Sequence, residues 1–195
     1  RLVPLLNNFL KASTDKQKQM EPVLDAIIFD KKFKLLKVDV DDLLILALGA
    51  RKQLGSKRVQ RFLDLFKKVR IKQREFYLLE LLIEERKPDA FEYVVENLTV
   101  DVNEIRKGRT LMHILAKSNL FGEDRQIIDY ILTETDYDPN TVDSEGYTAL
   151  GYLLEASKGQ FLKNPDTNEY TPLGKLILRF LEMSDLDVNA VGLYG

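Results

Sequence analysis

Apolar residues along most of the chain recur at spacings of three and four positions, which is the period of an amphipathic α-helix. The faces that follow this pattern contain Val59, Phe62, Leu63, Phe66 and Val69; Phe76, Leu79, Leu82 and Ile83; Phe91, Val94, Val95 and Leu98; and Ile127, Ile128, Ile131 and Leu132. No segment shows the sustained alternation of a half-buried strand. The pattern therefore predicts an all-α fold made of short paired helices joined by turns.

A short phrase rich in Asp and Asn returns three times between these predicted helices. It reads TVDVN at 99–103, DYDPN at 136–140 and DLDVN at 185–189. A glycine follows the Asn of each phrase by five or six residues, at Gly108, Gly146 and Gly195. Asp and Asn close turns by hydrogen bonding to nearby backbone, and glycine permits the positive φ of a tight reversal. We therefore expect a structured turn after each phrase.

Two threonines, Thr110 and Thr148, each stand two residues after a glycine and directly before an apolar segment. A threonine in that place can accept a hydrogen bond from a free N–H of the first helical turn, as an N-cap does. With helix starts near Asp41 and Glu75 as well, the helix pairs repeat about every 34 to 38 residues. A period of this length is typical of helical repeat arrays.

The residues around these threonines resemble a known repeat family. Residues 108–116 (GRTLMHILA) are similar to the G-x-T-P-L-H-x-A-A motif of the ankyrin-repeat family, and residues 142–150 (VDSEGYTAL) resemble the same motif. Residues 187–190 (DVNA) match the D-V-N-A of that family. The resemblance covers about 88–195 and implies a solenoid of stacked helix pairs whose turns project along one edge.

We divide the chain into residues 1–36, an N-terminal helical cap or the end of a preceding domain, and residues 37–195, about four divergent ankyrin-like repeats. The second and third phrases lie further apart than the first and second, and we assign the excess to an insertion near 157–170. Residues 173–183 then form the second helix of the same repeat. The last repeat is followed by a truncated turn at Gly195, which suggests a fragment of a longer protein.

The resemblance implies that partner contacts come from the turns and from the first helix of each repeat. The side chains expected to be exposed there are Arg106, Lys107, Arg109, Lys117, Ser144, Glu145, Tyr147 and Glu155, with Glu104, Ser118 and Thr141 beside them. Arginine and tyrosine are favoured interface anchors, so Arg109 and Tyr147 are the expected hot spots. The alternative is that each is an ordinary exposed side chain. The residues expected to shape the repeat turns are Gly108, Thr110, His113, Gly146 and Thr148.

His113 is the single histidine of the chain, which has no cysteine. It could act as a general base or a metal ligand, but one His without any Cys cannot make a typical zinc site. The family resemblance implies instead that it hydrogen-bonds between adjacent repeat turns. The chain also has no G-x-S-x-G, H-E-x-x-H or glycine-rich phosphate loop. We therefore expect no enzymatic activity, no metal and no cofactor.

Charge is unevenly distributed, although the net charge is only −2. Residues 51–74 hold ten Lys or Arg and one acid, Asp64. This basic segment could contact nucleic acid, anionic lipid or an acidic protein, but a solvated charged face is the simpler interpretation. Its aromatic residues, Phe62 and Phe66, lie on the apolar helix face, so we expect core packing rather than base stacking.

A second charged cluster, Asp39, Asp41 and Asp42, precedes an apolar segment. Neighbouring carboxylates can hold a divalent cation or do acid–base chemistry. Acidic residues also cap helix N-termini and interact favourably with the helix dipole there. We favour the capping interpretation for this cluster.

The expected function is that of a protein–protein interaction module, a scaffold or adaptor. No apolar run approaches the roughly 18 residues of a membrane span, no signal peptide is visible, and a cysteine-free chain suits a reducing compartment, so we expect a cytoplasmic location. Divergent ankyrin repeats suggest, by analogy, a host-directed effector of an intracellular pathogen that acts in the host cytosol. The alternative is the repeat portion of a larger enzyme that positions its protein substrate.

Overall fold

The computed structural model describes residues 2–30, 40–68, 74–98, 100–118 and 124–190. Over these residues the chain is all-helical, with eleven α-helices and only isolated β-bridges, so the predicted all-α class is confirmed. The chain divides into two compact units, Arg1–Arg74 and Glu75–Gly195. The predicted boundary between residues 36 and 37 lies outside the described residues.

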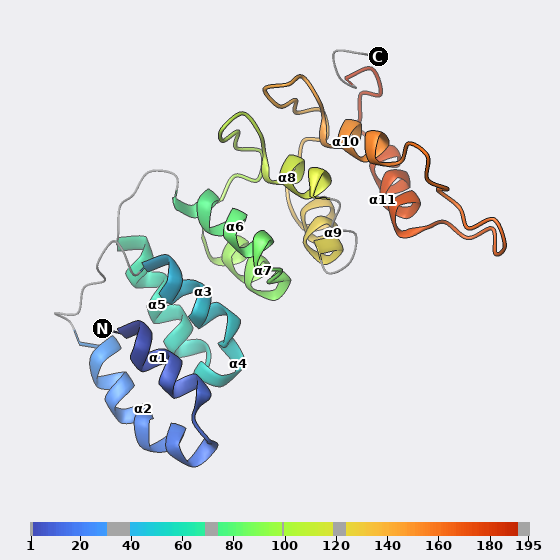
Figure 1. The fold of residues 1–195 in the computed structure, drawn as a ribbon. Helices are drawn as coiled ribbons and strands as arrows, with labels where there is room; N and C mark the ends of the chain where they lie inside the picture. Colours follow the sequence, from blue (N-terminus) through green and yellow to red (C-terminus); the bar gives the residue numbers. More distant parts are fainter. Residues whose placement is uncertain (1, 31–39, 69–73, 99, 119–123, 191–195) are drawn as a thin grey trace. The chain divides into compact units, whose positions relative to one another are not determined.

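Unit 1 is a small helical bundle (Figure 1). Its helices are α1 (Leu2–Lys11), α2 (Thr14–Ile28), α3 (Val40–Gly49), α4 (Arg51–Leu54) and α5 (Ser56–Lys68). Helix α1 packs against α2 and α3, and α5 packs against α2, α3 and α4. The N-terminal helices share the core of this bundle, because Leu6, Phe9, Leu24 and Ile28 are at most 1% exposed.

The apolar face predicted along α5 is present. Val59, Phe62, Leu63 and Phe66 are all buried, and Val69 lies outside the described residues. Burial of each such side chain contributes about 1.5 to 3 kcal/mol relative to leaving it in water. The two phenylalanines of the basic segment therefore belong to the core of unit 1, as their place in the helical period predicts.

Unit 2 contains three successive pairs of helices, the first beginning at Arg74, the last residue of unit 1 (Figure 1). They are α6 (Arg74–Glu84) with α7 (Pro88–Asn97), α8 (Leu111–Lys117) with α9 (Asp124–Glu134), and α10 (Ala149–Ala156) with α11 (Pro172–Leu181). Helix α8 lies beside α10 and α7 beside α9, while α8 contacts α9 and α10 contacts α11. The buried side chains include Phe91, Val94, Leu111, Leu115, Ile127, Ile131, Leu150, Leu153, Ile177 and Phe180.

Three helices of unit 2 begin with the same cap. The side-chain oxygens of Thr110, Thr148 and Thr171 accept hydrogen bonds from the backbone N–H three residues later, at the starts of α8, α10 and α11. Such a cap satisfies one of the N–H groups that the first helical turn leaves unpaired, which typically contributes about 1 kcal/mol. The predicted caps at Thr110 and Thr148 are thus present, and Thr171 adds a third.

The segment expected to be an insertion, 157–170, is a helix-free loop between α10 and α11. An isolated bridge joins Lys163 to Tyr170, and the carbonyl of Leu162 accepts a hydrogen bond from the Thr171 N–H at 2.8 Å. Because the loop joins the end of α10 to the start of α11, it leaves α10 at the end opposite Thr148. In Figure 1 it projects away from the loops that precede α8 and α10.

Candidate functional site

The loop before α8 ends in a tight two-residue hairpin. Arg106 and Arg109 exchange backbone hydrogen bonds of 2.8 and 2.9 Å, and between them Lys107 and Gly108 have φ values of 48° and 81°. Two consecutive positive φ values define the type I′ turn, whose twist suits a hairpin. The positive φ expected at Gly108 is therefore present, and Lys107 shares it.

A second hairpin precedes α10 and touches the first. The Asp143 N–H donates to the carbonyl of Tyr147 at 2.8 Å, and Gly146 has a φ of 83°. The Ser144 N–H donates to the Gly108 carbonyl at 2.6 Å, so the two hairpins are joined directly. A Cβ on Gly108 would lie 2.3 Å from the Ser144 hydroxyl oxygen. Gly108 is therefore needed both for its positive φ and for the close approach of its neighbour.

The Asp143 carboxylate organises the second hairpin. It accepts hydrogen bonds from the backbone N–H groups of Glu145 at 2.8 Å and Tyr147 at 3.0 Å, and from the Tyr152 hydroxyl at 2.6 Å. Partial burial opposes ionisation of this carboxyl, but the hydrogen bonds outweigh it and hold the pKa of Asp143 below its usual value. Burial, together with the hydrogen bond to Asp143, raises the pKa of the Tyr152 hydroxyl.

His113 connects the two hairpins through its imidazole ring. Its Nδ1 accepts from the Thr110 N–H at 3.2 Å and lies 2.7 Å from the Thr110 hydroxyl oxygen, so Nε2 carries the proton and donates to the Tyr147 carbonyl at 2.9 Å. The ring is 1% exposed, and burial lowers its pKa from the ordinary value. This is the hydrogen bond between adjacent turns that the family resemblance implies.

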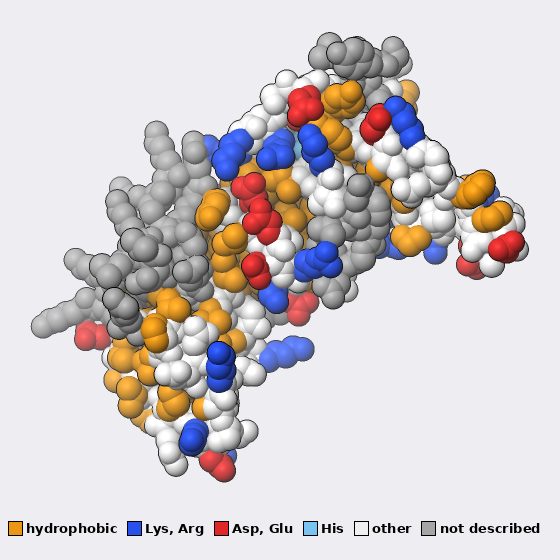
Figure 2. All heavy atoms as spheres, in the orientation of Figure 1, with side chains coloured by type: hydrophobic (Ala, Val, Ile, Leu, Met, Phe, Trp, Pro, Cys, Tyr) orange, Lys and Arg blue, Asp and Glu red, His pale blue; other side chains and the backbone are white. Residues whose placement is uncertain are grey.

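A charged and aromatic cluster covers α8 and α10 beside these hairpins. The Lys117 ammonium lies 4.8 Å from the centre of the Tyr152 ring and 3.3 Å from a carboxylate oxygen of Glu145. The rings of Tyr147 and Tyr152 are 5.2 Å apart. We call the surface made by Lys107, Arg109, Lys117, Ser144, Glu145, Tyr147 and Tyr152 the hairpin–helix face. Figure 2 shows Lys and Arg side chains gathered over α8 and the hairpin before it.

The Asp-and-Asn phrases are joined to one another by a regular ladder of hydrogen bonds. The Asn103 amide donates to the Asp136 carbonyl at 2.7 Å and accepts from the Asp138 N–H at 2.8 Å. Asn140 repeats this pair toward the third phrase, with 2.7 Å bonds to the Asp185 carbonyl and from the Asp187 N–H. Each of the two asparagines thus fastens its own turn to the next one along the chain.

The eight residues predicted to contact a partner differ in exposure. Lys107, Lys117, Ser144, Glu145 and Glu155 are exposed, whereas Arg106, Arg109 and Tyr147 are half-buried. Some of them already have partners. Arg106 forms an ion pair with Glu104, and Glu155 pairs with Lys158 at 2.6 Å. Both expected hot spots, Arg109 and Tyr147, therefore keep only part of their side chains accessible.

Asp143 and Tyr152, which hold the hairpin–helix face together, are not among the residues predicted from the sequence. Asp143 lies inside the quoted ankyrin-like motif, but its hydrogen bonds to backbone N–H groups depend on the hairpin conformation. Tyr152 lies four residues after Thr148, one helical turn into α10, and that spacing could have placed it beside the hairpin.

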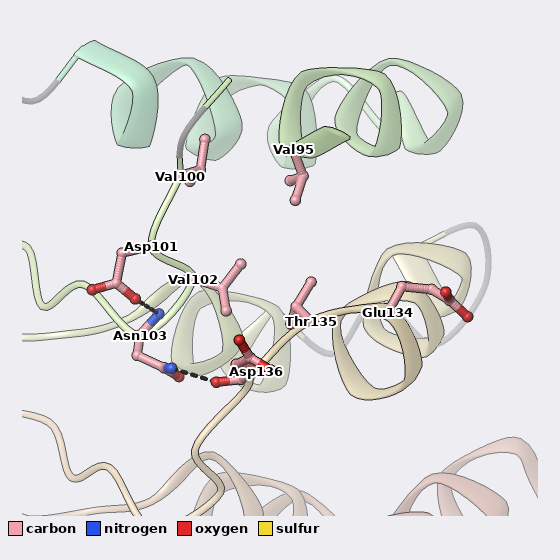
Figure 3. Close-up of a pocket in the computed structure, with 8 residues that line it drawn as sticks. All are labelled: Val95, Val100, Asp101, Val102, Asn103, Glu134, Thr135 and Asp136. Atoms are coloured by element: carbon pink, nitrogen blue, oxygen red, sulfur yellow. Dashed lines mark hydrogen bonds between the residues drawn. The ribbon is translucent and has the colours of Figure 1, made fainter. Parts of the chain in front are cut away.

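A pocket of about 270 Å³ opens at the ends of α7 and α9 (Figure 3). Its apolar lining comes from Val95, Val100 and Val102, and the ladder bond from Asn103 to Asp136 forms part of its wall. Glu134 and Asp101 also border it; in Figure 3 the Glu134 carboxylate points away from the other labelled residues, and the Asp101 carboxylate accepts a hydrogen bond from the Asn103 N–H at 2.9 Å. Within the described part of the chain, no group of three or more His, Cys, Asp or Glu side chains could hold a metal ion.

Of the two charged clusters outside unit 2, the structure describes side chains of the basic segment but not those of the acidic cluster. In the basic segment, Arg58 makes a two-bond ion pair with Asp25 at 2.6 and 3.0 Å, and Arg61 donates to the Ile28 carbonyl at 2.7 Å. These two arginines therefore serve the packing of α5 on α2. The side chains of the acidic cluster, Asp39, Asp41 and Asp42, lie outside the described residues.

Comparisons with known proteins found no relative of this chain. No protein-family model, no curated protein and no solved structure matches the chain. Among the described helices, none is both long enough and apolar enough to cross a lipid bilayer.

Proposed function

We propose that residues 75–195 form an ankyrin-like repeat array that binds another protein through its hairpin–helix face. The observation that carries the proposal is the ladder. Asn103 and Asn140 make the same pair of hydrogen bonds to the next turn along the chain, although the 157–170 loop adds residues between Asn140 and its partners. A turn geometry preserved across unequal repeats supports stacking of equivalent units.

The composition of the face supports protein binding. Tyr147 and Tyr152 offer ring surface, and aromatic and arginine side chains are the commonest anchors of protein interfaces. Their contact with each other, and that of Tyr152 with Lys117, limits their freedom before any partner arrives. Less side-chain entropy is then lost on binding.

Quantitative partner capture tests this proposal. The tagged chain is crosslinked in cell lysate, and the recovered proteins are compared by mass spectrometry between the wild type and the double variant Arg109→Ala/Tyr147→Ala. Loss of two interface anchors should lower recovery of a specific partner by about tenfold or more. Circular dichroism and the melting temperature establish that the variant is folded.

The matched control is Lys175→Ala/Tyr77→Ala. It removes one exposed cation from α11 and one exposed tyrosine from α6, both outside the hairpin–helix face. The control should recover the same partner as the wild type. Equal recovery by all three chains would contradict binding through this face.

A further inference from the structure

Most charged side chains of the hairpins and of helices α8 and α10 are matched within the fold. Ion pairs join Arg106 to Glu104, Lys117 to Glu145 and Lys158 to Glu155. The Asp143 carboxylate accepts three hydrogen bonds, as described above. Two cations of the first hairpin differ, because Lys107 and Arg109 have no ion pair within the described residues. The hairpin therefore carries two positive charges without an ion-pair partner, one on each side of Gly108.

The backbone at Lys107 gives a second, independent observation. Its φ of 48° lies in the left-handed region, where the first position of a type I′ turn strongly favours Asn, Asp or Gly. A lysine there is strained, and strain of this kind is often retained where it serves function. A residue outside the set that the turn prefers thus places an exposed ammonium at the tip of the hairpin.

Exposed apolar side chains stand at equivalent sequence positions of the two loops. Ile105 and Val142 each follow a ladder asparagine by two residues, and they are 53% and 43% exposed. Both belong to the loops that lead into the hairpins. A ligand that meets Lys107 and Arg109 therefore finds exposed apolar groups on the same pair of loops.

We infer that Lys107 and Arg109 bind an acidic segment of the partner protein, with at least two Asp or Glu residues beside an apolar one. The inference rests on the proposed function and names the chemistry of its ligand. Carboxylates form strong charge-assisted hydrogen bonds with Lys and Arg. A nucleic acid fits less well, because it presents a continuous run of phosphates, whereas the hairpin offers only two cations without an ion-pair partner.

Selection from a phage library of random 16-residue peptides tests the inference on the intact chain. The enriched peptides should be rich in Asp and Glu, and their affinity should fall as salt is raised. For a synthetic copy of one enriched peptide, Lys107→Asn or Arg109→Gln should each raise Kd by about fivefold. A fluorescein-labelled 16-nucleotide RNA is measured in parallel and should bind at least tenfold more weakly than the peptide.

Lys107→Asn also separates binding from folding. Asparagine suits the left-handed conformation, so this variant should melt at a higher temperature than the wild type while it binds the peptide more weakly. Arg86→Asn is the matched control, because Arg86 is an exposed cation with a φ of 52° in the turn between α6 and α7. It should raise the melting temperature and leave the peptide Kd unchanged.

The outcomes distinguish this inference from the proposed function. Enriched peptides without acidic residues, a peptide Kd indifferent to Lys107 and Arg109, or RNA binding as tight as peptide binding would each overturn the inference and leave protein binding intact. A selection that enriches no peptide, joined with equal capture in the partner experiment, would overturn both.

Discussion

The Nε2–H of His113 donates a hydrogen bond to the carbonyl oxygen of Tyr147, which is 2.9 Å away and 34 residues further along the chain. On the other side of the ring, Nδ1 accepts from the N–H of Thr110. Imidazole can donate from one nitrogen and accept at the other only when it is neutral. The fold of the two hairpins therefore depends on the uncharged form of this residue.

Stability should consequently fall as the solution becomes acidic. The folded-state pKa of His113 lies below the ordinary value of 6.5, so the unfolded chain binds more protons between the two pKa values. The free energy of unfolding should be highest above pH 6.5, decrease as pH falls through the folded pKa, and lose no more from this residue below it. Urea unfolding from about pH 7.5 to 5 measures the slope. His113→Gln should flatten it, and an unchanged slope would refute this assignment.

Asn140→Ala should destabilise unit 2 by about 1 to 2 kcal/mol, because it removes two hydrogen bonds between successive turns. Asn189→Ala is the control. Asn189 holds the same place in the third phrase, yet within the described residues its side chain bonds to no following turn. The second substitution should change the free energy of unfolding by less than about 0.5 kcal/mol. If thermal unfolding showed that the two substitutions change the free energy of unfolding equally, the ladder hydrogen bonds of Asn140 would contribute nothing to stability.

Gly174→Ala should be among the most damaging single-methyl changes in unit 2. The new Cβ would lie 2.2 Å from the Leu162 carbonyl oxygen, which also accepts the hydrogen bond from Thr171. Relief requires a shift of the 157–170 loop, at a cost of about 1 to 3 kcal/mol. Gly49→Ala, at a helical glycine with open space around it, should instead stabilise the chain by about 0.5 to 1 kcal/mol. Calorimetry of both variants would reveal shifts of opposite sign.

Two tyrosines should respond oppositely to loss of their hydroxyl groups. The Tyr137 hydroxyl is buried with no hydrogen-bond partner within the described residues, so Tyr137→Phe should be neutral or stabilise by up to about 1 kcal/mol. The Tyr152 hydroxyl donates to Asp143 at 2.6 Å, so Tyr152→Phe should destabilise by about 1 to 3 kcal/mol. Chemical unfolding measures both values. If Tyr137→Phe instead lowered the free energy of unfolding, this would indicate that the Tyr137 hydroxyl hydrogen-bonds to ordered water.

The helix faces, the helix caps and the long loop could be predicted from the sequence, because each depends only on residues that are close in the chain. The faces of α5, α6, α7 and α9 follow the helical period, since hydrophobic burial selects positions three and four apart. Thr110 and Thr148 were identifiable as caps because a capping oxygen needs only the next helical turn. The 157–170 loop was visible as an excess in the spacing of the phrases.

The composition of the face was harder to predict, because it depends on contacts between residues distant in sequence. Lys117 reaches Tyr152 and Glu145 only after α8 lies beside α10. Arg109 and Tyr147 were expected to be exposed from their place in a turn, but the packing of the two hairpins half-buries both. The strain at Lys107 has no sequence signal except the Gly that follows it.

The short backbone hydrogen bond from Ser144 to Gly108 affects how much entropy is lost when a ligand binds. Two hairpins that were free to move would each have to be immobilised during association, and that loss of entropy would weaken the complex. Here the backbone bond, the His113 ring and the asparagine ladder set the spacing of the hairpins when the chain folds. The surface is therefore preorganised, and the entropy of aligning its halves is lost before any ligand arrives.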